Sequence, residues 1–324
     1  MAIDGITWIQ AASYFGAGVS VGFGAIGAAL GEGYTAGQAS SVLSYRPKMS
    51  GDILRTMLVG QAIAETAGIF ALVVSMLLMF GELKGHSLTE AWAYVGAGLA
   101  AGLSAIGSSI GAGFPAGEAC VSLARQPSAS GQITLNMLIG SSITQTPCIF
   151  GLVIAFLLMF MDYGSKPYYP YWAAFLGAGL STGLAAIGPG YGGGLVGAGA
   201  CRSLARNPEA QRPITTAMLV GIGTTQSTAI YGFLISLILI FKGFPESTSY
   251  VPSFALLGAG LAMGFGGIGP GIGVGITGYY ALDQVGRVPE EATLLTRTML
   301  VGMAASQSTG IYSLVVALLL VLNA

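Results

Sequence analysis

Long apolar runs, separated by short polar segments, make up most of the chain. Eight such runs lie near 11–44, 53–80, 91–124, 133–160, 171–205, 214–241, 252–286 and 295–322. At a rise of about 1.5 Å per residue, a helix formed by any of them would cross the ~30 Å hydrocarbon layer of a bilayer. The pattern therefore predicts an all-α integral membrane protein with eight transmembrane helices.

The runs repeat as four copies of one helical hairpin, with a period of 80 or 81 residues. We predict hairpin 1 at 1–84, hairpin 2 at 85–165, hairpin 3 at 166–246 and hairpin 4 at 247–324. The two helices of each hairpin are joined by a short basic loop containing proline. The loop residues are Arg46 and Pro47, Arg125 and Pro127, Arg206 and Pro208, and Arg287 and Pro289.

The two helices of each hairpin differ in composition. Every first helix starts with Gly-X-Gly, at 16–18, 96–98, 177–179 and 258–260, and is rich in glycine, whereas the second helices are rich in Leu, Ile, Val and Met. Small residues let helix backbones approach closely in lipid. We therefore expect a tight inner layer of glycine-rich helices and an outer layer of apolar helices. The GxGxxG match at 22–27 follows no strand, so we interpret it as packing rather than nucleotide binding.

Composition and charge agree with a membrane protein and exclude a soluble domain. Hydrophobic residues make up 53% of the chain and charged residues 8%, and the mean hydropathy is +0.75. The net charge of −1 indicates no nucleic-acid partner. Nine of the twelve basic residues lie at the end of the proline loops, and the others are Lys84, Lys166 and Lys242. This asymmetry predicts cytoplasmic proline loops and both termini outside. Three cysteines inside apolar runs are expected to be small buried side chains: Cys120, Cys148 and Cys201.

One carboxylate, Glu65, lies in the middle of the second apolar run. A charge at this depth costs several kcal/mol unless it is protonated, paired or coordinated, which makes Glu65 a functional candidate. In the other hairpins the same position holds Gln145, Gln226 and Gln307. We interpret these neutral amides as groups that hydrogen-bond between helices.

The register of each hairpin places a second residue at the same depth. The Glu/Gln position lies eighteen residues after the loop proline, and fifteen residues before that proline stand Glu32, Ala112, Gly193 and Val274. Only hairpin 1 has carboxylates at both positions. Two carboxylates close together in a low dielectric must share a proton or hold a cation. With oxygens from Gln61, Ile63 (its carbonyl) and Thr66, Glu32 and Glu65 form a candidate site for H⁺ or Na⁺.

Three segments carry a family resemblance: GQAIAET at 60–66, ARQP at 124–127 and AIGPGYGGG at 186–194. They resemble the ring-forming c subunit, or proteolipid, of rotary F-type and V-type ATPases, here with four hairpins fused in tandem. The resemblance implies a homo-oligomeric ring in lipid that turns against a stator a-type subunit. It also implies that the proline loops dock central-stalk subunits, that the chain itself has no catalytic residues or organic cofactor, and that it lies in a prokaryotic plasma membrane.

Within that family the chain resembles the sodium-binding variety. Glu32, Ile63, Glu65 and Thr66 match its ligand positions, with Na⁺ held at Glu32, Glu65 and Thr66. Ala67 and Phe70 stand where that variety has a hydroxyl and a tyrosine, which leaves both Na⁺ and H⁺ open.

The loss of three carboxylates implies few ions per turn of the ring. Because the catalytic head handles a fixed number of ATP per turn, this favours an ATP-driven pump with a low ion-to-ATP ratio. Two alternatives are a stand-alone eight-helix transporter or channel, and a structural ring with vestigial ion binding. The sequence also leaves open whether hairpin 2 of the same chain or hairpin 4 of the next completes the site.

Overall fold

The computed structural model describes residues 5–81 and 87–324, and every element in these ranges is helical. The helices are α1 Gly5–Tyr45, α2 Ser50–Phe80, α3 Leu88–Arg125, α4 Ser130–Ile143, α5 Thr146–Phe160, α6 Tyr168–Ala185, α7 Ile187–Arg206, α8 Gln211–Thr225, α9 Ser227–Phe241, α10 Val251–Val285 and α11 Ala292–Leu322. Short 3₁₀ helices form the proline turns: η1 Pro47–Met49, η2 Pro127–Ala129, η3 Pro208–Ala210 and η4 Pro289–Glu291.

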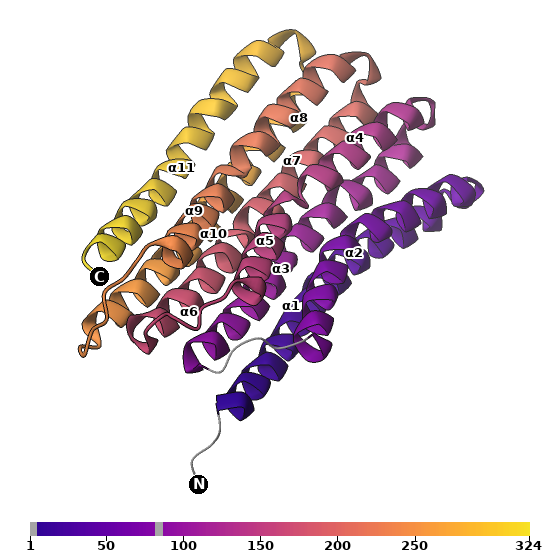
Figure 1. Ribbon diagram of the computed structural model, residues 1–324. Coiled ribbons are helices and arrows are strands. Elements are labelled where there is room, and N and C mark those ends of the chain that lie inside the picture. Colours follow the sequence, from indigo (N-terminus) through magenta and orange to yellow (C-terminus); the bar gives the residue numbers. More distant parts are fainter. Residues whose placement is uncertain (1–4, 82–86) are drawn as a thin grey trace.

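Eight spans in these ranges are long and apolar enough to cross a membrane, which confirms the prediction from hydropathy. In the middle of the chain one span can consist of two helices in line, as with α4 and α5. The start of α1 and the end of α11 lie at the same end of the molecule, opposite the proline turns (Figure 1). Lys84 and His86 lie outside the described residues.

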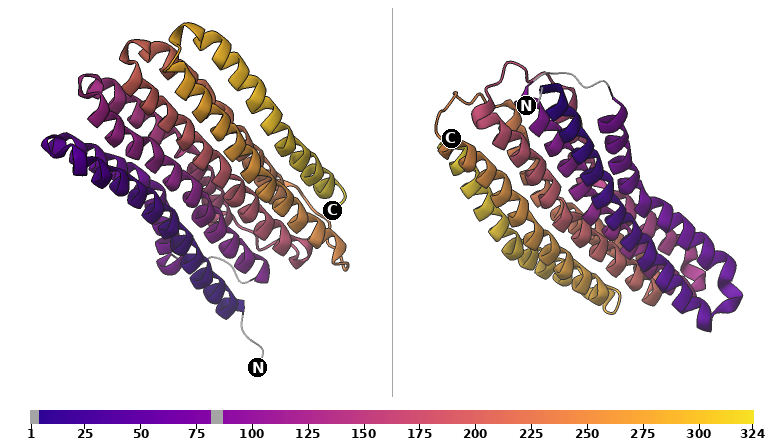
Figure 2. Two further views of the ribbon diagram at one scale, coloured as in Figure 1. Left: turned by 180° about the vertical axis from the view of Figure 1, so that it is seen from behind. Right: turned by 90° about the horizontal axis from the view of Figure 1, so that it is seen from below.

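The four hairpins stand side by side in chain order and form a curved array of two layers (Figures 1 and 2). The first helices, α1, α3, α6–α7 and α10, pack against one another in one layer. The second helices, α2, α4–α5, α8–α9 and α11, cover that layer on one side. Hairpin 1 and hairpin 4 are therefore the two edges of the array.

Glycine lets the first helices touch backbone to backbone. A methyl group at Gly98 would collide with the carbonyl of Gly16 in the preceding hairpin, and the same collision recurs between Gly179 and Gly96. Only a residue without Cβ fits at these contacts, which explains the Gly-X-Gly segments. The expected layer of glycine-rich helices is thus present in the chain.

In the described residues three helix breaks lie near the middle of the membrane spans; the one between α8 and α9 at Gln226 has no nearby proline, whereas the other two coincide with proline. Pro147 has no N–H to donate to the carbonyl of Ile143, and the chain makes a turn at 144–145 between α4 and α5. Pro189 has the same effect on Ala185, where α6 ends. The helix that carries Glu65 has no such break, because α2 is continuous from Ser50 to Phe80.

All three cysteines are free and buried, as predicted. They lie in different hairpins or on different helices, within apolar packing. No role beyond packing follows for them from the structure.

Candidate ion-binding site

Glu65 lies near the middle of α2, and its side chain is exposed in the isolated chain. The hydroxyl of the next residue, Thr66, donates a hydrogen bond to the carbonyl oxygen of Ala62 at 3.1 Å. A carboxylate halfway along a continuous, apolar helix has no local partner from its own backbone. Any compensation for its charge must come from a neighbouring helix or from a bound cation.

Glu32 on α1 comes close to Glu65 from the adjacent helix. It is half-buried, and the negative charge of Glu65 acts on its carboxyl group. Gln61, one turn before Glu65 on α2, donates from Nε2 to the backbone carbonyl of Glu32 at 3.3 Å. The structure therefore brings Glu32, Gln61 and Glu65 together, as the common register of the two helices predicted.

Ile63 lies in the contact between hairpins 1 and 2. Its carbonyl oxygen accepts a hydrogen bond from Nε2 of Gln145 at 3.1 Å, and the same amide nitrogen lies 3.4 Å from the carbonyl oxygen of Ser108. Gln145 thus reaches back from its own hairpin to the preceding one. The amide nitrogen takes a position next to backbone oxygens that a cation could otherwise use.

The three glutamines are buried, whereas Glu65 is not. Gln145, Gln226 and Gln307 are 6, 8 and 9% exposed. Gln226 donates to the hydroxyl of Thr225 at 3.2 Å. Within the described part of the chain, the amide of Gln307 has no hydrogen-bond partner. Glu65 is exposed and lies in hairpin 1, at one edge of the array.

The predicted docking loops all lie at one end of the array (Figure 1). Arg46, Pro47, Arg125 and Pro127 are exposed there or half-buried. Each loop forms the same 3₁₀ turn with proline at its start. The arginines of the third and fourth loops differ from the others, because they belong to a network of charges.

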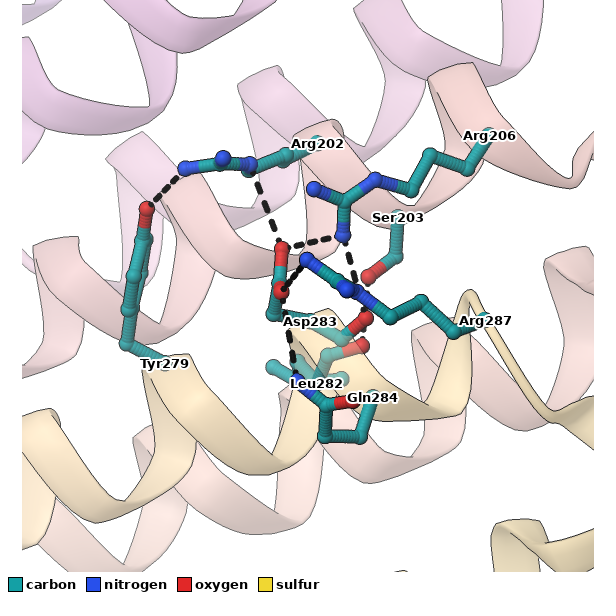
Figure 3. A network of polar contacts seen from close by, with 8 residues as sticks. All are labelled: Arg202, Ser203, Arg206, Tyr279, Leu282, Asp283, Gln284 and Arg287. Carbon is teal, nitrogen blue, oxygen red and sulfur yellow. Dashed lines mark hydrogen bonds and ion pairs between the residues drawn. The ribbon is translucent and has the colours of Figure 1, made fainter.

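That network is centred on Asp283 near the end of α10 (Figure 3). Asp283 is 6% exposed and pairs with Arg206 of α7, with Nε of Arg202 at 3.2 Å and with Nη2 of Arg287 at 3.3 Å. Arg202 also donates to the hydroxyl of Tyr279 at 2.7 Å. These pairs tie hairpin 3 to hairpin 4 close to the proline turns, far from the depth of Glu65.

The sequence patterns did not lead us to this network, although the repeat contains a signal for it. Arg202 and Asp283 each lie nine residues after the position equivalent to Glu32, in consecutive hairpins and with opposite charges. Glu118 was also missed as a further carboxylate within the spans. It is half-buried on α3, and the charges of Arg202 and Arg125 act on it.

Comparison with known proteins decides the family. The family model described as the C subunit of ATP synthase matches the chain four times, at residues 15–78, 95–158, 176–239 and 257–320. The chain belongs to the ATP synthase C-subunit family. Each match falls within one hairpin and includes both of its helices.

Single relatives differ in how much of the chain they cover. The ATP synthase c subunit of Natranaerobius thermophilus is 49% identical over 80 residues, which is 25% of this chain and 92% of the relative. The ATP synthase c subunit of Petrotoga mobilis is 58% identical over 65 residues, 20% of this chain and 68% of the relative. The A-type ATP synthase K subunit of Methanocaldococcus jannaschii is 31% identical over 226 residues, 69% of this chain and 94% of the relative. The relatives are bacterial and archaeal, and this chain is a c subunit of four fused repeats.

Proposed function

We propose that this c subunit forms a rotor ring with further copies of itself and carries one cation, H⁺ or Na⁺, per chain at Glu65. The observation that carries the proposal is the contrast at one depth of the membrane. The three glutamines are buried within the chain, Gln145 in contact with the preceding hairpin, and the glutamate at the same position is exposed at the edge of the array. Each chain then supplies one ion-carrying group to the ring.

Glycines at the edge of hairpin 1 have free space where the equivalent glycines of later hairpins contact a neighbouring hairpin, which supports ring closure. No atom of the described residues lies within 4 Å of the Cβ position at Gly18, Gly22 or Gly33 of hairpin 1. The equivalent glycines of the later hairpins meet the backbone of the preceding hairpin, as Gly98 meets Gly16. The free edge of hairpin 1 is therefore shaped to take hairpin 4 of another chain.

The same geometry favours hairpin 4 of the neighbouring chain as the part that completes the ion site. Gln145 reaches back to the Ile63 carbonyl of the preceding hairpin. If hairpin 4 of the next chain packs against hairpin 1 as hairpin 1 packs against hairpin 2, Glu65 lies next to the carbonyl of Ala305 and the hydroxyl of Ser308 in that chain. With Glu32, these groups offer oxygens to a proton or a sodium ion.

Binding and release of the cation at Glu65 would drive the ring. A neutral or cation-bound Glu65 can face lipid at low cost, whereas an ionised one needs a positive partner from the stator subunit. Transfer of one unit charge against 100 mV takes about 2.3 kcal/mol. With one carrier for every four hairpins, each ion receives a large share of the free energy of ATP hydrolysis. This arrangement suits an ATP-driven pump whose proline loops dock the central stalk.

The carrier role is tested by ATP-driven ion uptake into vesicles that contain the whole enzyme. Glu65→Gln should abolish uptake while the ring still assembles, because Gln already occupies this position in three hairpins. Asp162→Asn, in an exposed loop at the opposite end, serves as the control with normal uptake. Normal pumping by the Glu65→Gln enzyme would refute the proposal.

The identity of the ion is tested separately by carbodiimide labelling, which attacks protonated carboxyl groups in the membrane. Protection of Glu65 by Na⁺ at constant pH indicates sodium as the transported ion. Labelling that depends on pH and is insensitive to Na⁺ indicates the proton. The absence of labelling at every pH would favour a structural ring.

A further inference from the structure

A groove lies between the first turns of α8 and α11, near the proline turns. Its volume is about 410 Å³, and it is lined by Arg212 and Thr216 from α8 and by Thr293, Thr296 and Arg297 from α11. Both helices belong to the outer layer of the array. Hydroxyl and guanidinium groups are thus collected on a face otherwise made of apolar side chains.

The two arginines of this groove have no counter-ion. Both side chains are exposed, and none of the ion pairs among the described residues includes Arg212 or Arg297. No carboxylate lines the groove. The carboxylates nearest in sequence, Glu209, Glu290 and Glu291, lie in the turns η3 and η4 and outside the lining. The groove carries two positive charges and offers several hydroxyl donors.

The depth of the arginines corresponds to the phosphate layer of a bilayer. Gln307 lies near the middle of the span Pro289–Leu322, and Arg297 precedes it by ten residues. At about 1.5 Å per residue this is ~15 Å, half of the ~30 Å hydrocarbon thickness. Arg212 precedes Gln226 by fourteen residues, or ~21 Å, which lies within the headgroup layer.

The same groove between hairpins 1 and 2 provides an internal comparison. It has a volume of about 460 Å³ and is lined by Asp52 and Arg55 of α2 and by Thr134 and Leu135 of α4. In the repeat, Leu135 takes the position of Arg297, and Arg55 takes that of Thr216. One arginine and one aspartate leave this groove without net charge. The two grooves have similar volumes and lie between equivalent helices, but only the groove between α8 and α11 has a pair of arginines and no carboxylate in its lining.

We propose that the groove between α8 and α11 is a binding site for the headgroup of an anionic phospholipid. Arg212 and Arg297 hold the phosphodiester through charge-assisted hydrogen bonds, and the hydroxyls of Thr293 and Thr296 donate to its remaining oxygens. Two arginines at the membrane surface favour an anionic over a zwitterionic lipid by roughly 10- to 30-fold. The acyl chains lie along the exposed apolar side chains of α8, α9 and α11, such as Leu219 and Leu300.

The test uses the purified full-length assembly in vesicles of phosphatidylcholine with a small fraction of headgroup-photoactivatable phosphatidylglycerol. Cross-links are mapped by mass spectrometry of peptides. We expect the first turns of α8 and α11 to be labelled about 10-fold more than the first turns of α2 and α4 in the same molecules. The double variant Arg212→Gln/Arg297→Gln should lose this difference, whereas Arg55→Gln should not reduce it, because it removes a positive charge only from the groove used for comparison.

A second variant keeps the test informative if the double variant does not assemble. Asp52→Asn removes the neutralising charge from the groove of hairpins 1 and 2 and should increase labelling of α2 and α4. Equal labelling of the two grooves in the wild type, or unchanged labelling in the double variant, overturns the proposal. Suppression of labelling by added inorganic phosphate also overturns it, because the site would then recognise the free anion.

Discussion

Gly18 provides a direct test of how the chain meets its neighbours. It occupies the same register position as Gly98, whose added methyl group would collide with the carbonyl of Gly16. At Gly18 itself no described atom lies within 4 Å. Gly18→Ala should therefore leave the fold of a single chain intact, and the new methyl group should collide only when hairpin 4 of another chain docks.

The size of the effect follows from the cost of overpacking. Insertion of a methyl group against a backbone atom that cannot move freely costs about 1–3 kcal/mol. Since 1.4 kcal/mol corresponds to tenfold, the association constant at each contact between chains should fall roughly 5- to 140-fold. The substitution also favours helix formation by up to ~1 kcal/mol, so the isolated chain should not become less stable.

The measurement is the fraction of closed rings, by native mass spectrometry or electron microscopy of the purified assembly. Gly98→Ala should lower the thermal stability of the chain itself, because its collision is internal. Gly223→Ala is the control, since Gly223 is exposed, has no neighbour within 4 Å among the described residues, and is replaced by alanine at the equivalent Ala62 and Ala304. Rings of Gly18→Ala that form as readily as those of the wild type would refute the reasoning.

Two further predictions concern polar groups within the chain. Gln145→Leu removes the hydrogen bond to the Ile63 carbonyl and should lower the free energy of unfolding by about 1 kcal/mol without loss of ion transport. The loss is measured by thermal unfolding in detergent. Gln307→Leu should have a smaller effect in this assay, because the amide of Gln307 has no partner in the described part of the chain. Asp283→Asn leaves three arginines without their shared counter-ion and should cost about 2 kcal/mol, less than a fully buried pair because the arginines are partly exposed. In the same assay, an equal loss for the exposed Asp162→Asn would contradict this view.

The fold could be predicted from the sequence because the repeat fixes its geometry. The constant distances from each loop proline gave the common depth of Glu32 and Glu65, and in the structure Gln61, one turn before Glu65, donates to the backbone carbonyl of Glu32. The Gly-X-Gly segments predicted close helix packing, which Gly98 and Gly16 confirm. Local periodicity and composition are enough to predict the depth of a residue in its hairpin and the close packing of glycine-rich helices, because both are properties of a single hairpin and its contact face.

The order in which hairpins face one another could not be predicted. Whether the residue at the position of Glu65 turns to the preceding or to the following hairpin depends on the direction in which the array winds, and no distance along the chain encodes this. The contact of Gln145 with Ile63 supplies the direction. The network of Asp283 was missed for a similar reason, because its partners Arg202 and Arg206 lie one repeat away.

The central claim is that a single glutamate in each chain carries the ion. The most direct measurement counts the carbodiimide adducts per chain by intact mass, maps them to peptides, and follows ATP-driven ion uptake in the same samples. The account predicts one adduct per chain, at Glu65, and uptake that stops when a small fraction of chains has reacted. Uptake that continues after every Glu65 has reacted, or inhibition that tracks an adduct at Glu32 or Glu118 instead, would contradict it.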